Sequence, residues 1–359
     1  MSQSVRVPDT LEELLTPQWL SEALGLRYPG IRVTAVTPGP VVERVSTNAR
    51  FRIECEGGVP DGLSPHLCAK GYFGETGRQY RSAGVSEALF YRDLVSSIPV
   101  RTLRPVYADV DIATGHGVVL TEDVAVEGAV FLDGREPYSP EQAAASLEQY
   151  ALLHGSTWNS TAVGEADWLG PRIASSAMTR GLVEIRGNFD GPIGAGVPDG
   201  ARRAELLMES FLAIPSYTSQ LDHWNLLLGD AHIGNLLLDA GGRPWLVDWQ
   251  LVQRGPWFID VGYHIASALS VEDRRRHEGD LVEGYLQALV RAGGERPSEE
   301  EVRIGLCCGM VYGFFLWGIT LKVEPAITAV RLERLGGAVA DHDALSVVLD
   351  AAGRAERAR

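Results

Sequence analysis

Three polar residues in the second half of the chain have the types and spacing that transfer of a phosphoryl group requires. Asp230 and Asn235 lie five residues apart in LGDAHIGN, and Asp248 follows thirteen residues later in LVDWQ. Such a transfer needs a carboxylate that orients the attacking hydroxyl, together with oxygen ligands for a hard cation such as Mg²⁺. The spacing allows one carboxylate to face a substrate while an amide and a second carboxylate hold the metal.

The sequence around these residues predicts a β-hairpin within an otherwise helical region. Two short β-type runs, LLL before Asp239 and WLVDW, flank a Gly-Gly turn. The loop before the first strand would then carry Asp230 and Asn235, and the second strand would carry Asp248. Helical periodicity dominates the rest of the chain after Asp123, as in PEQAAASLEQYALLHGSTW and ARRAELLMESFLAIPSYTSQL.

The first third of the chain predicts an antiparallel sheet with one main helix. Between residues 31 and 123 the β-type runs IRVTAV, ARFRIEC, HLCAKGYF and GHGVVLTED are separated by Gly, Pro and Asp clusters. A helical pattern spans Val85 to Ile98, and one or two short helices open the chain and end at Gly25. We therefore expect an α+β fold of two lobes: an N-terminal sheet lobe over residues 1–123 and a larger, mostly helical C-terminal lobe over residues 124–359.

The motifs LGDAHIGN and VDWQ resemble those of the aminoglycoside phosphotransferase and choline kinase superfamily, including its ecdysteroid-kinase-like branch. The family pattern is HGDxxxxN followed by a strand and DW or DF. The resemblance implies a bilobal protein-kinase-like fold, use of ATP and Mg²⁺, Asp230 as the catalytic base, and Asn235 and Asp248 as metal ligands. One departure is Leu228, which stands where the family usually has a loop-bracing histidine, and which puts the activity in question more than the fold.

A lysine and a glutamate in the first third match further parts of the same family. Lys70 lies on the predicted strand HLCAKGYF, and Glu87 follows seventeen residues later in SEALFYRDL. Taken singly, the two would read as a surface lysine and an ordinary helix glutamate. Their order and spacing relative to Asp230 favour the family's ion pair, in which the glutamate would hold the lysine against the nucleotide phosphates.

Two segments are candidates for further nucleotide contacts, and both resemble the family only in position. The turn ERVSTNARF replaces a Gly-rich loop, so Ser46, Thr47 and Asn48 are candidate phosphate contacts, although STN is equally an ordinary turn sequence. VVLTEDVAV resembles the hinge between the lobes, where Glu122 or its neighbours would offer backbone groups to an adenine-like ring.

Other residues near these motifs are expected to support the site. In RGPWFIDVGYHIA, Asp260 resembles the aspartate that opens a helix and bonds back to the catalytic loop, and it would also cap that helix. His154 and Trp158 in LEQYALLHGSTW are interpreted as packing residues. The acceptor site is expected within the helical part, especially residues 158–220. The aromatic side chains of VYGFFLWGI either line that site or, as we favour, belong to the core: Tyr312, Phe314, Phe315 and Trp317.

Composition narrows the class of protein further. The chain of 359 residues is 45% hydrophobic and 22% charged, typical of a globular protein. A net charge of -15 excludes nucleic acid and anionic membranes as expected partners. The four cysteines form no CxxC pair, the N-terminus has no secretory pattern, and the longest apolar run, Ile304 to Leu321, suits a buried helix, so we expect a cytoplasmic enzyme.

Several other functions fit the sequence less well than that of a small-molecule kinase. A protein kinase would need a long activation segment, and only LVQRGPWFID separates VDWQ from Asp260. A hydrolase would need a nucleophile such as that of GxSxG, which the chain lacks. A non-catalytic interaction module would make five ordered motif elements a coincidence. Two alternatives stay open: a kinase that confers aminoglycoside resistance, and a degenerate nucleotide-binding scaffold. The identity of the hydroxyl-bearing acceptor and the oligomeric state are left open.

Overall fold

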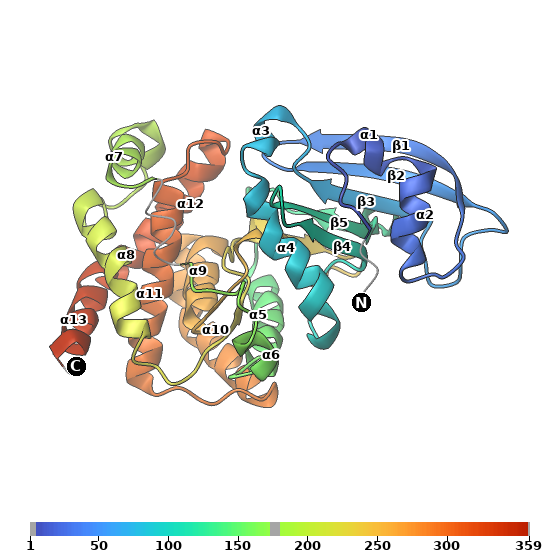
Figure 1. Ribbon diagram of the computed structural model, residues 1–359. Coiled ribbons are helices and arrows are strands. Elements are labelled where there is room, and N and C mark those ends of the chain that lie inside the picture. Colours follow the sequence, from blue (N-terminus) through green and yellow to red (C-terminus); the bar gives the residue numbers. More distant parts are fainter. Residues whose placement is uncertain (1–4, 173–179, 358–359) are drawn as a thin grey trace.

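The computed structural model of the protein describes residues 5–172 and 180–357. A five-stranded antiparallel sheet lies at one end of the molecule and a large helical part at the other, with α4 between them (Figure 1). The expected α+β architecture of two lobes is therefore confirmed. The limit between the lobes at residues 123 and 124 stays a prediction; β5 ends at Glu122 and a 3₁₀ turn, Val124–Glu127, follows it.

The N-terminal sheet has the strand order β1-β2-β3-β5-β4. Its strands are β1 (Val33–Glu43), β2 (Thr47–Cys55), β3 (His66–Gly71), β4 (Pro105–Asp111) and β5 (His116–Glu122). The four predicted β-type runs lie in β1, β2, β3 and β5, and β4 is a further, unpredicted strand at the edge of the sheet. Because β3 pairs with β2 on one side and β5 on the other, Lys70 lies in the middle of the sheet, opposite Asn48 and Val119.

Over residues 5–122, four short α-helices complete this lobe, two before β1 and two between β3 and β4 in the sequence. They are α1 (Leu11–Leu14), α2 (Pro17–Gly25), α3 (Glu75–Arg78) and α4 (Val85–Leu89). The predicted helix from Val85 to Ile98 is confirmed in extent, but it changes its winding. After α4 it continues as a π-helical turn, Phe90–Leu94, and ends in a 3₁₀ turn, Val95–Ser97.

The C-terminal lobe is built mainly from helices that pack around α11. The helices are α5 (Pro140–Ser156), α6 (Thr161–Gly164), α7 (Leu182–Asp190), α8 (Ala204–Thr218), α9 (Phe258–Ala268), α10 (Val271–Arg291), α11 (Glu299–Gly318), α12 (Pro325–Asp341) and α13 (Ala344–Arg357). Serine side chains begin three of them: Ser139, Ser270 and Ser298 each accept a hydrogen bond from a backbone N–H of the first turn. The predicted buried helix is α11, and among the described residues no helix is long and apolar enough to cross a membrane.

Five short strands hold the loops that carry the motif residues. They are β6 (Val130–Phe131), β7 (Asn225–Leu227), β8 (Leu236–Leu238), β9 (Pro244–Leu246) and β10 (Gln253–Gly255). β8 and β9 pair antiparallel, which confirms the predicted hairpin, and β6 pairs with the other edge of β8. The second strand was expected to carry Asp248, but β9 ends at Leu246 and Asp248 precedes the 3₁₀ turn that follows it. β7 pairs with β10, so the loop after β7 and the segment after β9 are both anchored at each end.

Candidate active site

A single lysine joins two carboxylates from different lobes. Lys70 Nζ on β3 lies 2.7 Å from Glu87 Oε2 on α4 and 3.0 Å from Asp248 Oδ1, which follows β9. The contact predicted between Lys70 and Glu87 is thus present, and Asp248 extends it. Burial opposes the charge of the lysine, but Asp248 and Glu87 more than offset that effect and raise the pKa of Lys70 above its usual range. Lys70 is therefore a fixed cation.

The backbone next to Asp248 is tied to the same helix. Asp248 has a left-handed conformation with φ of 64°, which Asp tolerates better than most side chains, and Trp249 N donates a long hydrogen bond of 3.4 Å to Glu87 Oε1. The Trp249 ring stacks on Phe90 of the π-helical turn, with ring centroids 3.9 Å apart, and its Nε1 donates to Thr102 Oγ1 at 3.0 Å. Asp248 is thereby held at the junction of the two lobes.

The loop that carries Asp230 is fixed through its backbone. Asp260, in the first turn of α9, accepts hydrogen bonds from Leu228 N at 2.7 Å and Gly229 N at 2.9 Å, which confirms the expected bond from Asp260 back to the loop. The expected helix cap is wrong: Trp257 occupies the N-cap position of α9, and no side chain of the described residues makes a capping hydrogen bond there, because the Asp260 carboxylate is directed at the loop. Tyr312 OH donates to Gly229 O at 2.8 Å, and His264 Nδ1 lies 2.9 Å from Ala231 O. These backbone contacts hold a loop in which Leu228 provides no polar side chain.

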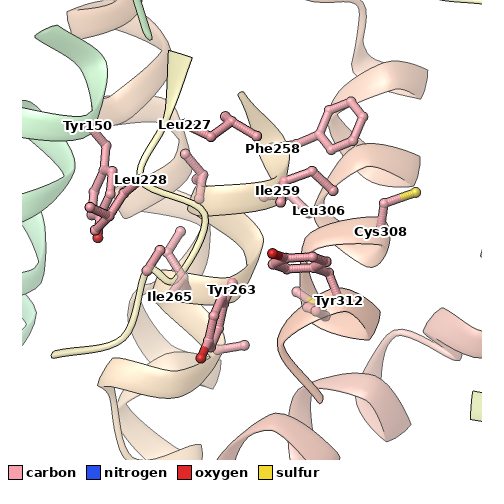
Figure 2. Close-up of a cluster of buried hydrophobic side chains, with 14 of the residues drawn as sticks. Tyr150, Leu227, Leu228, Phe258, Ile259, Tyr263, Ile265, Leu306, Cys308 and Tyr312 are labelled. Carbon is pink, nitrogen blue, oxygen red and sulfur yellow. The ribbon is translucent and has the colours of Figure 1, made fainter. Parts of the chain in front are cut away.

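Leu228 itself is fully buried. It belongs to the hydrophobic cluster in Figure 2, together with Tyr150, Tyr263 and Tyr312. The position at which the sequence resemblance implies a bracing histidine is thus used here for packing. The bracing role is distributed among the side chains that contact the loop backbone from α9 and α11.

The carboxylate of Asp230 has defined partners. Tyr263 OH donates to Asp230 Oδ1 at 3.0 Å, and His232 Nε2 lies 3.6 Å from Oδ2. Burial alone would raise the pKa of Asp230, but His232 and the hydrogen bond from Tyr263 outweigh it and lower that pKa below its usual value. Asp230 is therefore ionised at neutral pH, the state in which it can accept a proton.

Asn235 and Asp248 have the donor atoms that suit Mg²⁺. Asn235 Nδ2 donates to Asp230 O at 2.9 Å, so its amide oxygen is the polar atom left to act as a ligand, and Asn235 O accepts from Val247 N at 3.0 Å beside Asp248. Within residues 5–172 and 180–357 no three His, Cys, Asp or Glu side chains are grouped as a metal site. Mg²⁺ commonly uses one or two carboxylates together with substrate phosphates, so an amide and one carboxylate fit it.

A pocket lies between the sheet and the start of the helical lobe. Asn48, Lys70, Glu87 and Glu122 are among the residues that line it. Ser46 precedes β2 and Thr47 begins it; both are buried and outside the pocket lining. Their assignment to the phosphates stays a prediction.

The side chain of Glu122 has a structural task at one end of this pocket. Its Oε1 accepts from Ser64 N at 3.1 Å, and its Oε2 accepts from Arg104 Nε. Its own backbone N–H donates to Arg104 O at 3.0 Å. The expected contact between this hinge segment and a nucleobase stays a prediction.

Several residues with a place in the site were missed in the sequence. Phe131 on β6 lines the pocket and is 44% exposed, a large apolar side chain left open at its edge. Tyr263 lies one turn after Asp260 on α9, and this helical spacing is the signal that could have placed it near the loop. Nothing local in the sequence marks Phe131, because strand pairing between β6 and β8 brings it there.

The supporting residues named in the sequence divide into two groups. Trp158 stacks on His223, and Phe314 and Phe315 are buried in the core, as interpreted. His154 is buried too, but it is more than a packing residue: its Nε2 lies 3.3 Å from Asp260 Oδ2 and its Nδ1 lies 2.8 Å from Tyr285 OH.

Comparison with known protein families finds a match that includes the loop that carries Asp230. Residues 201–294 match the model of the ecdysteroid kinase-like family. The matched stretch contains Asp230, Asn235, Asp248 and Asp260. The resemblance to the kinase-like superfamily is thereby confirmed for this stretch. No curated protein matches the chain.

Solved structures of low identity were also found. A choline/ethanolamine kinase family protein from Mesorhizobium loti is 20% identical, with 86% of this chain and 92% of that chain covered and a TM-score of 0.44. The choline kinase LicA from Streptococcus pneumoniae is 14% identical, with 90% and 98% covered and a TM-score of 0.47. A GDP complex of aminoglycoside 2'-phosphotransferase-IIIa is 12% identical, with 95% and 99% covered and a TM-score of 0.43. At these TM-scores the likenesses assign neither activity nor substrate.

Proposed function

We propose that the protein is a small-molecule kinase that transfers the γ-phosphoryl group of ATP to a hydroxyl group. The observation that carries the proposal is the position of Lys70, which bridges Glu87 and Asp248 at the edge of a pocket. A buried cation shared by two carboxylates needs a strong reason to be retained, and binding of phosphate provides one. The ionised Asp230 on the neighbouring loop supports the same reaction.

Each residue has one task in the proposed mechanism. Lys70, aligned by Glu87, binds the nucleotide phosphates, and Asn235 and Asp248 would hold Mg²⁺, which supplies charge neutralisation at the transferring group. Asp230 orients the acceptor hydroxyl and accepts its proton as the new oxygen–phosphorus bond forms. The bond between the γ-phosphorus and the bridging oxygen of ATP breaks in the same step, and ADP leaves.

The segment after Asp248 favours a small acceptor over a protein. Residues 249–257 form a 3₁₀ turn and strand β10, and α9 begins directly at Phe258. β10 pairs with β7, so this segment is part of the scaffold beneath the loop rather than a free activation segment. A protein substrate would have no extended segment to dock against here.

The proposal is tested by calorimetric titration of Mg·ATP into the wild type and into Asp248→Ala. Micromolar, Mg²⁺-dependent binding that the variant loses supports the assignment and justifies a screen of hydroxylated metabolites and aminoglycosides for phosphate acceptance. Asp222→Ala is the matched control, since the Asp222 side chain is fully exposed to solvent. A folded wild type that binds no nucleotide would refute the proposal, and binding without transfer to water or any acceptor would favour a degenerate scaffold.

A further inference from the structure

A chain of two hydrogen bonds leads from the core of the C-terminal lobe to the carboxylate of Asp230. Trp317 Nε1 donates to Tyr263 OH at 2.7 Å, and Tyr263 OH donates to Asp230 Oδ1 at 3.0 Å. An indole N–H is only a donor, so the phenol oxygen must act as acceptor toward Trp317. The single phenol proton is then directed at Asp230. Tyr263 and Trp317 are both buried, so water does not compete for the bond between them.

The ring of Tyr263 packs directly against the backbone of α11 at Gly313. A Cβ atom on Gly313 would overlap Cδ2 of Tyr263, so only glycine leaves room for the ring at this position. Gly313 and Trp317 are four residues apart and share one face of α11. One turn earlier, a Cβ on Gly309 would overlap Phe258 O, so the backbones of α9 and α11 are in close contact. Figure 2 shows Tyr263 and Tyr312 projecting from these two neighbouring helices.

We propose that Tyr263, oriented by Trp317 and seated on Gly313, is a positioning residue that fixes the carboxylate of Asp230 toward the acceptor hydroxyl. The inference rests on the proposed kinase function. The terminal torsion of an Asp side chain is broad, so an untethered carboxylate would sample many orientations. With Oδ1 held by the phenol, Oδ2 is the oxygen presented to an acceptor, and His232 Nε2 stays 3.6 Å from it, beyond hydrogen-bond length.

The same contacts would also be seen if Tyr263 merely joined α9 to α11. The two roles differ in what they predict for kinetics. A structural tie contributes to the free energy of unfolding and leaves the reaction of the folded protein unchanged. A positioning residue affects kcat, because misalignment of the base is felt in the transition state, while nucleotide affinity stays constant.

The experiment measures Mg·ATP hydrolysis, with water as the acceptor, in the wild type, Tyr263→Phe, Trp317→Phe and the double variant. Water then provides the attacking oxygen and Asp230 accepts its proton. We expect Tyr263→Phe to lower kcat by about 10- to 100-fold, the size expected for a hydrogen bond to a charged group, and to change KM for Mg·ATP less than about twofold. Trp317→Phe should lower kcat less, and the double variant should match Tyr263→Phe alone, because the indole acts only through the phenol.

A matched pair of controls lies in the other lobe. Trp19 and Tyr107 are also buried and in edge-to-face contact, with ring centroids 5.3 Å apart. Trp19 Nε1 donates to Arg6 O at 2.8 Å, and Tyr107 OH donates to Val5 O at 3.2 Å. Trp19→Phe and Tyr107→Phe remove comparable hydrogen bonds far from Asp230, so kcat should change less than about twofold in either variant.

The outcomes separate this inference from the proposed function. Wild-type kcat in folded Tyr263→Phe would overturn the positioning role while leaving the kinase proposal intact. If the effects of the two substitutions on the free energy of activation are fully additive, Trp317 does not act through Tyr263. A wild type that binds Mg·ATP but hydrolyses none of it over prolonged incubation would overturn the inference, since Asp230 would then orient no water. Absence of nucleotide binding would refute the proposed function itself.

Discussion

Lys70 and Asp248 are 178 positions apart in the sequence, yet the lysine Nζ lies 3.0 Å from a carboxylate oxygen of Asp248. The same ammonium group lies 2.7 Å from Glu87, whose side chain is 4% exposed. Removing the lysine would leave the buried Glu87 carboxylate without compensation, which costs more than the ion pair contributes. The proposed nucleotide site therefore depends on contacts from both lobes.

Replacing Lys70 by methionine should reduce stability as well as nucleotide binding. Glu87 would remain buried with no cation beside it, and we expect a loss of about 3–5 kcal/mol in the free energy of unfolding, measured by urea denaturation. Lys322 is the matched control. It is the only other lysine of the chain, and its contact with Tyr80 OH is exposed. Lys322→Met should leave the unfolding curve nearly unchanged. An equally small effect in both variants would show that Glu87 does not depend on the charge of Lys70 for stability.

Asp230→Ala should lower turnover by orders of magnitude and leave ATP binding largely intact. In the proposed mechanism this side chain orients the acceptor, whereas the residues that line the pocket around Lys70 come from the sheet and its connections. Rates of phosphoryl transfer to an acceptor found in the screen, with calorimetric ATP titrations of the same preparations, give both quantities. A variant as active as the wild type would show that another group performs this task.

Phe131→Ala should weaken nucleotide binding by about three- to tenfold without affecting stability, since a half-exposed ring at the edge of the pocket gains its burial only when a ligand arrives. The neighbouring Val130 is 58% exposed and does not line the pocket, so Val130→Ala is the control. Calorimetry on the two variants provides the comparison. If both variants bind ATP as the wild type does, the adenine ring of ATP does not contact Phe131.

Stability should fall as the pH is lowered from about 6.5 to 4. Burial is the main cause that lowers the pKa of His264 to about 4, and its ring is held between Ala231 O and Ser146 Oγ. An unfolded histidine takes up a proton near pH 6.5, whereas the folded one resists until about pH 4. The stabilising contribution is thus complete above pH 6.5 and is lost in this window. We expect about 2 kcal/mol less stability at pH 5 than at pH 7 from this one residue.

The check is the difference in unfolding free energy between pH 7 and pH 5, measured for the wild type and for His264→Gln. The variant should show a smaller drop, by about 2 kcal/mol, because glutamine does not titrate. His116, whose pKa burial likewise lowers to about 4, contributes in both proteins and cancels in the comparison. Equal drops in the two proteins would show that His264 takes up its proton without unfolding the chain.

The sequence predicted those features that depend on local spacing. The thirteen residues from Asn235 to Asp248 suffice for one hairpin, so both ends must return to the same place, as β8 and β9 show. The lysine strand, the glutamate helix and the bond from Asp260 to the loop were predicted from the resemblance to a known family, whose order of motifs the chain follows. The π-helical turn after α4 was missed, since its apolar residues fit an α-helix equally well.

Features that depend on contacts between distant elements were not predictable. Tyr263 and Trp317 meet only because glycines let α9 and α11 come close, and no pattern within either helix signals that approach. Tyr312 and Trp317 were interpreted as core residues, which their burial confirms, but Tyr312 OH also donates to the loop that carries Asp230, and Trp317 Nε1 donates to Tyr263. The burial of these side chains was thus predicted from the apolar, aromatic segment VYGFFLWGI, whereas the hydrogen bonds that they make in the core were not predicted.

The stacking of Trp249 on Phe90 has a consequence for building hybrids between this protein and its relatives. The two rings come from different lobes, and Thr102 of the N-terminal lobe accepts the indole hydrogen bond. A chimera that joins one lobe of this chain to the other lobe of a relative would separate these partners. Each of them would then pack against a side chain of the relative that does not match it. Phe90, Thr102 and Trp249 should therefore be kept or replaced together in such a chimera, although they belong to different lobes.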